Sequence, residues 1–506
     1  MKRYSIVFVF AILTFSCANL LEKTPQAQET SANYFNTQDG ALKATNAIYE
    51  KLRGWNTTAW GPIGLVDVAS DDANKGSTST DSNDMIELNN ATYLTNNGTI
   101  EGYYKEHYQA INRCNQVIVN VPEANFDKNE KDRYIAEAKC LRAFFYFNLV
   151  RAYGGVPIID RLLQPEEYKQ ARASRDETYD FIIQDLEEAA LVLPTKSGYG
   201  SADLGRVTQG TAYALLAKVH LFRASFNGDA TEYGKALTAA EKVVNSGEYT
   251  LYPNFADIFK LSGENSSESI FEVQTHDFEQ GGGSSQYSEI QGIRSNSLNR
   301  GWGFNIPSKS LRDEFEANDP RYDATIITAG QTLYDGEVVP RPADDVFGDN
   351  SDPISEFYSY KVYAPSHNGG NGNSPMNIRL IRYSDILLIA AEAANAQGNT
   401  TKALNYLNMV RARARGNLNV LPDVVGADQV VVREAIWHER RVELAMEQHR
   451  YFDLMRMDNV VPGYAKTKLS ENTDNKFDAS KNKVYPIPQS EINAVGSDLL
   501  EQNPNY

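Results

Sequence analysis

Cysteine is scarce in this chain, with three residues among 506. Cys114 and Cys140 fall within helical patterns, where a free thiol usually behaves as a small buried apolar side chain. A fold stapled by disulfides, which depends on several paired cysteines, is therefore not predicted. The third cysteine, Cys17, stands at the end of an N-terminal apolar segment.

Basic residues are fewer than acidic residues in this chain. The chain has 49 Lys and Arg against 66 Asp and Glu, a formal net charge of −17, and loss of an N-terminal segment that carries Lys2 and Arg3 would bring it to −19. Nucleic acids and other polyanions bind to basic surfaces, so we expect no nucleic acid partner. A neutral ligand is the simpler expectation.

Long apolar runs are absent except for residues 4–15, which follow Lys2 and Arg3. That run is too short for a stable membrane-spanning helix, and its setting predicts a secretory signal peptide over residues 1–16. Ser16-Cys17 resembles the end of a bacterial lipobox, in which the cysteine thiol is lipidated. Residues 17–36 would then be a lipid-anchored tether. The alternative is ordinary cleavage near Ser16, with an incidental cysteine.

Signatures of catalysis are missing too. His438-Glu439 begins like a zinc-protease helix, but that motif needs a second histidine where Val442 stands. Gly154-Gly155 has no accompanying phosphate-loop or dinucleotide pattern, and no nucleophile elbow occurs. We therefore expect no enzymatic activity, no cofactor and no metal site. A glycoside hydrolase remains an alternative, because it needs only two suitably spaced carboxylates and the chain has 66 acidic residues.

Helical periodicity is what the sequence does contain. Residues 378–397 and 400–415, joined by a Gly398-Asn399 turn, look like one tetratricopeptide-type unit of two helices. The remaining helices are expected at 37–53, 101–120, 129–151, 176–193, 208–226, 231–246 and 428–455. The predicted fold class is mostly α, a tetratricopeptide-like repeat scaffold.

Two stretches of low periodicity interrupt that scaffold, at about 55–100 and 249–376. Long irregular insertions are uncommon in a compact domain and often carry function. We expect a single domain over 37–506, with helical repeats at about 37–53, 101–246 and 378–455. The insertions would hold a few short strands.

The segment 434–456, EAIWHERRVELAMEQHRYFDLMR, contains no Pro or Gly and predicts one long helix. Arg440 and Glu443 stand three positions apart, as do Glu447 and Arg450, a spacing at which opposite charges meet on a helix. We expect this charged helix to stabilise the scaffold by holding the last repeat against the C-terminal segment.

Several of these segments resemble the SusD/RagB family of outer-membrane lipoproteins. Residues 141–157, LRAFFYFNLVRAYGGVP, are similar to the family's central helix, and 382–393, RYSDILLIAAEA, to a late helix. Segment 434–456 matches the family's HERRxELAFEGHRxFDLxR signature, with Met446 for Phe and Gln448 for Gly. The closing stretches 485–492 and 502–506 also match, so the resemblance spans most of the mature chain.

The resemblance implies a helical fold with four tetratricopeptide-like units, in which the irregular insertions form the ligand face. It further implies a surface lipoprotein of the outer membrane of Bacteroidota that captures a glycan and delivers it to a SusC-like TonB-dependent transporter without enzymatic activity. The acidic charge and the aromatic loops favour a neutral polysaccharide such as a β-glucan. A peptide-binding role like that on the RagB side of the family is the alternative.

Glycan capture needs aromatic faces for stacking and short polar side chains for hydroxyl groups, carried on loops. Trp302, between two glycines that would let backbone and ligand approach closely, is the first candidate, since family members often have a Trp in this context at the ligand face. The family also tends to carry an acidic residue in its early loop. The other candidates are Trp60, Tyr93, Tyr287, Asp71 and Asp72. The alternatives are buried aromatic residues and solvated acids, and the family's motifs do not include its ligand-binding residues.

Overall fold

The computed structural model describes residues 34–276, 284–348, 352–366 and 374–506. The predicted signal peptide, Cys17 and nearly all of the tether lie outside these residues. Ten long helices form the scaffold of the described chain: α3 (Gln38–Leu52), α6 (Gly98–Asn120), α7 (Lys128–Tyr153), α8 (Arg175–Ala190), α9 (Gln209–Asn227), α10 (Ala230–Val244), α14 (Tyr383–Ala396), α15 (Thr400–Arg415), α16 (Gln429–Glu443) and α17 (Arg450–Val460). The predicted fold class, mostly α, is confirmed.

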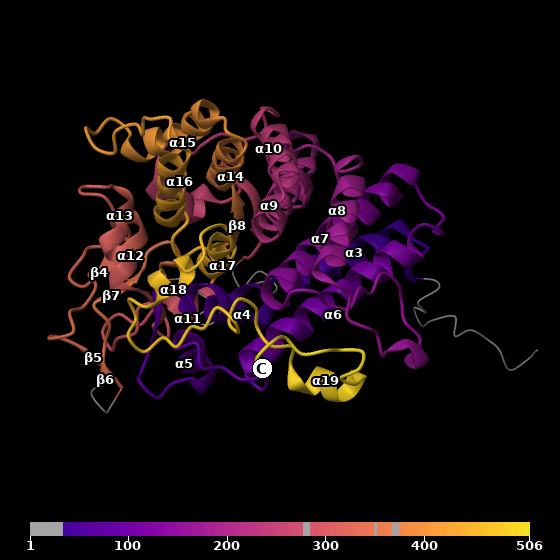
Figure 1. Cartoon of the computed structure of the whole chain (residues 1–506), viewed down its shortest axis with the longest axis horizontal. Coiled ribbons are helices and arrows are strands. Elements are labelled where there is room, and N and C mark those ends of the chain that lie inside the picture. The colour runs from indigo at the N-terminus through magenta and orange to yellow at the C-terminus, as the bar shows by residue number, and fades with distance from the viewer. Residues whose placement is uncertain (1–33, 277–283, 349–351, 367–373) are drawn as a thin grey trace, which may run out of the picture.

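The helices pack in sequence order, each against the next, from α6 to α10, and α14 then packs on α10 and α15 on α14 (Figure 1). Local sequence defines their starts. Ser174 caps α8, where its hydroxyl accepts from Glu177 N–H over 3.1 Å while the Glu177 carboxylate accepts from Ser174 N–H over 2.8 Å. Such a capping box satisfies two backbone donors that a helix start leaves free.

Helix α7 is the centre of the scaffold, buried almost continuously from Tyr134 to Tyr153. It packs against α3, α6, α8 and α9, which explains why its apolar residues cover every side. Cys114 and Cys140 are both buried, as predicted, and burial raises the pKa of both thiols. They are hydrophobic side chains of the core rather than reactive groups.

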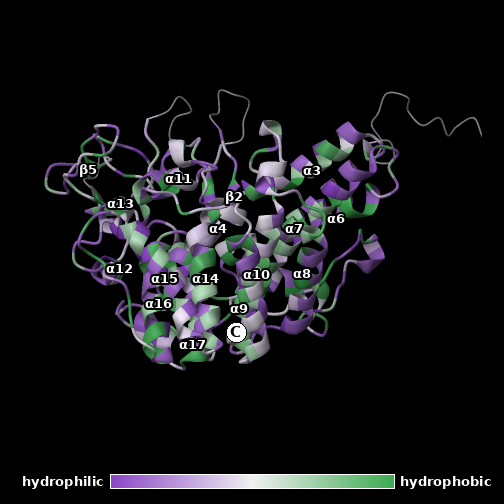
Figure 2. Cartoon of the chain, turned by 90° about the horizontal axis from the view of Figure 1, so that it is seen from above, coloured by the Kyte–Doolittle hydropathy of each residue, from purple (hydrophilic) through white to green (hydrophobic). Residues whose placement is uncertain are grey.

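The two insertions gather along one side of the paired helices (Figure 2). Their strands form four antiparallel pairs: β1 (Ala73–Gly76) with β3 (Phe304–Pro307), β2 (Ser269–Val273) with β8 (Ile378–Arg382), β4 (Ile326–Thr328) with β7 (Phe357–Ser359), and β5 (Val346–Phe347) with β6 (Asp352–Pro353). Short helices accompany them: α11 (Tyr287–Gln291), α12 (Lys309–Glu314) and α13 (Arg321–Thr325). Helices α18 (Tyr464–Leu469) and α19 (Gln489–Val495) belong to the C-terminal segment.

The first insertion is more helical than its sequence suggests. Two wide π-helical turns, η1 (Trp55–Ala59) and η2 (Ile63–Val68), flank the short helix α4 (Trp60–Pro62), and α5 (Asn83–Asn89) follows. Hydrogen bonds in a π-helix join residues five apart, so its apolar side chains do not repeat with the α-helical period of 3.6. The sequence of the first insertion therefore lacks the α-helical period, although the chain there forms helical turns.

The single helix predicted over 434–456 is wrong. Helix α16 ends at Glu443, and α17 begins only at Arg450. Between them Met446 and Gln448 both have φ of 62°, a left-handed conformation that no α-helix contains. Gln448 stands where the family signature has glycine, the residue best suited to such a φ. Its Nε2 donates to Thr58 O over 2.8 Å, which holds the turn against the first insertion.

The predicted charge pairs within 434–456 are also wrong, because both residues of the first pair have other partners. Glu443 pairs with arginines of three other segments, Arg321, Arg382 and Arg413. Arg440 pairs with Asp385 of α14 at 2.5 Å and with Asp453 of α17 at 2.7 Å. These charges join α16 to the neighbouring helices of the scaffold and, through Arg321, to the second insertion.

No helix within the described ranges is both long enough and apolar enough to cross a membrane.

Candidate functional site

Three of the four tryptophans of the chain meet on the insertion side. Trp55 and Trp60 stack with ring centroids 5.2 Å apart and planes inclined by 14°, and Trp302 lies 5.9 Å from Trp55 at 51°. All three are half-buried, so each residue keeps part of its surface open to solvent. We call this group the tryptophan platform. Trp60 and Trp302, predicted separately from the sequence, are thus brought together through Trp55, which the prediction missed.

Local winding explains the stack of Trp55 and Trp60. They stand five positions apart across η1, and a π-turn places such residues above one another. Trp60 Nε1 donates to Thr99 Oγ1 over 3.0 Å, which fixes the ring. The Glu106 carboxylate of α6 accepts from Asn56 N–H at 2.8 Å and from the Thr57 hydroxyl at 3.2 Å. In the sequence WNTTAW, the five-residue spacing of the two tryptophans is the only local sign of this stack.

Trp302 is placed by contacts of the backbone. Its N–H donates to Glu289 O over 2.8 Å, and a Cβ added at Gly301 would lie 2.0 Å from the same oxygen. Gly303 has φ of +73°, a conformation that favours glycine. The two glycines therefore allow close backbone packing inside the protein. The prediction that they admit a ligand is not supported.

A β-ladder brings the two insertions together. In β1 and β3, Ala73 pairs with Pro307 and Gly76 with Phe304. Phe304 in turn packs edge-on to Trp60, with centroids 5.1 Å apart. The ladder thus carries Trp302, two positions before Phe304, to the first insertion.

Two predicted aromatic residues belong to the core instead. Tyr93 is fully buried, and its hydroxyl lies 3.3 Å from Tyr451 Oη and accepts from Asn482 Nδ2 over 3.1 Å. Tyr287 is buried at the start of α11. Neither ring can stack on a ligand in this conformation, because the surrounding side chains cover both. Hydrophobicity alone could not separate these buried tyrosines from the half-buried tryptophans.

Asp71 and Asp72 are not available to a ligand either. Both are buried, and Arg441 bridges them, with Nη2 2.9 Å from Asp71 Oδ2 and Nε 2.8 Å from Asp72 Oδ1. Arg450 Nε adds a contact of 2.7 Å to Asp71 Oδ1. Burial opposes ionisation, yet the two guanidinium groups hold the pKa of Asp71 below its usual range. The prediction that these acids bind hydroxyl groups is wrong, because their oxygens are occupied by arginines.

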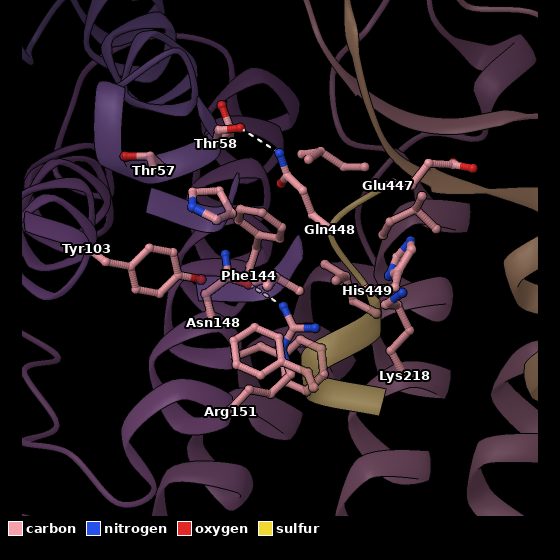
Figure 3. Close-up of a pocket in the computed structure, with 17 residues that line it drawn as sticks. Thr57, Thr58, Tyr103, Phe144, Asn148, Arg151, Lys218, Glu447, Gln448 and His449 are labelled. Atoms are coloured by element: carbon pink, nitrogen blue, oxygen red, sulfur yellow. Dashed lines mark hydrogen bonds between the residues drawn. The ribbon is translucent and has the colours of Figure 1, made fainter. Parts of the chain in front are cut away.

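The interior also contains a cavity, separate from the platform, of about 40 Å³. Arg151, Asn148, Gln448 and His449 point toward it (Figure 3). Binding sites for small organic ligands typically have several hundred Å³, so this cavity suits a few water molecules. Within the described residues, no group of three or more His, Cys, Asp or Glu is arranged to hold a metal ion.

Comparison with known proteins relates both halves of the chain to one family. Residues 267–506 match the model described as the SusD family, and residues 21–221 match the model described as starch-binding associating with outer membrane. SusD-like protein P2 of Formosa agariphila is 29% identical over 528 residues, covering 100% of both chains.

Solved structures agree with this relationship. Surface glycan-binding protein A from Bacteroides thetaiotaomicron, in complex with laminarihexaose, is 27% identical with a TM-score of 0.75, covering 92% of this chain and 99% of that one. A laminarin-binding SusD-like protein is 27% identical with a TM-score of 0.75, covering 93% of this chain and 100% of that one. Sequence and fold therefore agree, and the chain belongs to the SusD/RagB family.

Proposed function

We propose that this protein is a surface lipoprotein that captures a neutral oligo- or polysaccharide on the tryptophan platform and passes it to a SusC-like TonB-dependent transporter. The observation that carries the proposal is the meeting of Trp55, Trp60 and Trp302, all three of them half-buried, on the insertion side. Rigid aromatic rings present a large apolar face at little entropic cost. The apolar C–H faces of a sugar ring are well suited to stack on such rings.

The similarity to proteins that bind laminarin and laminarihexaose favours a β-glucan as the ligand. The net charge of −17 also supports a neutral ligand, because an acidic surface repels anionic polysaccharides. Association with the outer membrane is supported by the description of the family model that matches residues 21–221. We attribute anchoring to a lipid on Cys17.

A binding role without catalysis fits the positions of the buried acids. A glycosidase needs two carboxylates that reach the glycosidic bond, whereas Asp71 and Asp72 of the first insertion are covered and paired with arginine. Turnover of any oligosaccharide by the purified protein would overturn this part of the proposal.

Replacement of Cys17 by Ala tests the lipid anchor. The variant should leave the membrane fraction of cells, and its retention there would contradict lipidation.

The binding proposal is tested by isothermal titration on residues 18–506 with laminarihexaose, a panel of other neutral oligosaccharides and mixed peptides. Trp302→Ala should weaken binding of the active glycan at least tenfold, which corresponds to about 1.4 kcal/mol. Tyr168→Ala removes another exposed aromatic ring, remote from the platform in sequence, and should bind like the parent. Binding of peptides without any glycan response would favour the RagB-like alternative.

A further inference from the structure

A tight turn in the second insertion presents an exposed tyrosine. Gly336 N–H donates to Leu333 O over 3.0 Å, Leu333 N–H donates to Glu337 O over 2.8 Å, and Gly336 has φ of +91°. Leu333 is buried beneath the turn, while Tyr334 remains 40% exposed. A single exposed apolar residue is common on a protein surface, so a contact with something outside the chain is inferred from the rings that surround Tyr334.

Neighbouring tyrosines hold this ring in place. Tyr334 and Tyr360 stack with centroids 5.9 Å apart and planes inclined by 15°, and Tyr363 packs edge-on to Tyr334 at 5.5 Å. The Tyr360 hydroxyl accepts from Tyr334 N–H over 2.9 Å. Tyr363 Oη donates to Asp335 Oδ2 over 2.6 Å. The aromatic surface is preorganised, so a ligand would not have to order it on binding.

A cavity of about 180 Å³ opens beside this surface. We call it the tyrosine pocket; its principal lining residues are Phe259, Lys260, Pro320, Asp323, Tyr334 and Tyr360. It is larger than the roughly 10–15 Å³ that a single water requires and smaller than the several hundred Å³ of a typical small-molecule site, so it can hold only part of a ligand. Its mixture of aromatic walls and a few polar groups is the usual composition of a small-molecule site.

The polar groups of the pocket suit hydroxyl groups. Lys260 Nζ lies 2.6 Å from Asp257 Oδ1 and 5.1 Å from the Tyr334 ring centroid, which uses one of the three ammonium donors. Asp323, exposed at the rim, provides acceptor oxygens. One lysine against two aspartates leaves this group of charges negative. An anionic ligand is therefore disfavoured, and a neutral polyol is favoured.

From these contacts we infer that the tyrosine pocket is a second saccharide-binding site, which takes one sugar unit of a neutral glycan. The inference rests on the proposed function, since it assigns a further part of the same ligand class. Trp302 of the platform belongs to the same insertion as the pocket, and the rings of Tyr360 and Tyr363 beside Tyr334 are anchored in a buried cluster that includes Ile293, Leu298 and Tyr358. A polymer long enough to reach both sites would bind more tightly than a short oligosaccharide, because the second contact becomes intramolecular.

The test compares the parent protein with Tyr334→Ala, Tyr334→Phe, Trp302→Ala and Tyr168→Ala. Each is run through native gels that contain laminarin, starch, xylan, galactomannan or levan. Whichever polysaccharide retards the parent is then titrated as a polymer and as a short oligosaccharide. Tyr334→Ala should weaken polymer binding at least threefold and reduce the stoichiometry for the oligosaccharide from two to one. Tyr334→Phe, which keeps the ring face, and Tyr168→Ala should match the parent.

The outcomes separate this inference from the proposed function. If Tyr334→Ala equals the parent in affinity and stoichiometry while Trp302→Ala is impaired, the second site is refuted and the platform stands. If only Tyr334→Ala is impaired, the tyrosine pocket stands and the platform is refuted. If no neutral polysaccharide retards the parent, both fail. If Tyr334→Ala lowers the melting temperature, the polymer affinity of Asp323→Asn is measured in its place, because this variant leaves every ring in position. An unchanged polymer affinity in Asp323→Asn would then refute the pocket.

Discussion

Arg441 Nε donates to Asp72 Oδ1 over 2.8 Å, between residues separated by 369 positions. The same guanidinium reaches Asp71 at 2.9 Å and Glu314 at 2.6 Å. One side chain of α16 thus ties the first insertion to α12 of the second. The segment that looked like a catalytic helix is the place where the two insertions attach to the scaffold.

Arg441→Ala is predicted to lower the free energy of unfolding by about 3–5 kcal/mol, because it removes the hydrogen-bonded partner of the buried Asp72 carboxylate, whereas Asp71 keeps Arg450. Arg433→Ala, on the same helix, removes a partly exposed pair with Glu434 and should cost about 1 kcal/mol or less. Urea denaturation followed by circular dichroism provides both values. In the folded fraction, glycan affinity should be unchanged, and a loss of affinity at full stability would contradict this structural role.

The helical scaffold could be predicted from sequence because its signals are local. Periodicity located the long helices to within a few residues, and residues such as Ser174 and Gly398 marked where helices start and stop. The break after Glu443 could not be predicted, since neither Pro nor Gly stands there. Long-range contacts, such as that from Gln448 to Thr58, hold the left-handed turn against local helical preference.

The candidate site was only partly predictable for the same reason. Trp60 and Trp302 were correctly placed on the insertions, but their proximity depends on the ladder from Ala73 to Pro307, which no local pattern encodes. Tyr93 has the same chemistry as an exposed tyrosine, and only tertiary packing buries it. Asp71 was assigned to a ligand because its arginine partners lie more than 360 positions away.

Asp67 should make stability depend on pH. Burial raises its pKa to about 7, although the hydrogen bond from Asn305 and the bond from Gln448 N–H favour the charged form. In the unfolded chain the pKa is near 3.9. Between these values the folded state retains a proton that the unfolded state has lost, so this contribution to stability falls as pH rises from about 4 to 7.

Asp67→Asn is predicted to remove that contribution. The stability of the variant relative to the parent should rise with pH, by at most about 1.4 kcal/mol per pH unit. Urea unfolding at pH 4.5, 6 and 7.5 measures the difference, and a constant difference across that range would refute the assignment.

The left-handed turn at Gln448 predicts an unusual order of substitutions. Gln448→Ala loses the hydrogen bond to Thr58 O but keeps a Cβ at φ of 62°. Gln448→Gly loses the same bond and relieves a backbone strain of about 1–2 kcal/mol, less the entropy that glycine gains when unfolded. Glycine should therefore be the less damaging change, by about 1 kcal/mol. Thermal denaturation of both variants gives the order, and alanine being the milder change would refute the strain.

Gly301→Ala should impair the site through the backbone. The added Cβ would approach Glu289 O to 2.0 Å and Gly292 Cα to 2.7 Å, and neither can give way as a flexible side chain does. The loop must shift, at a cost of about 1–3 kcal/mol, and Trp302 shifts with it. We expect weaker glycan binding together with a lower melting temperature. Gly200→Ala, where nothing lies within 4 Å of the new atom, is the matched control and should leave both unchanged. Unaltered glycan affinity in Gly301→Ala would show that the position of Trp302 does not determine binding.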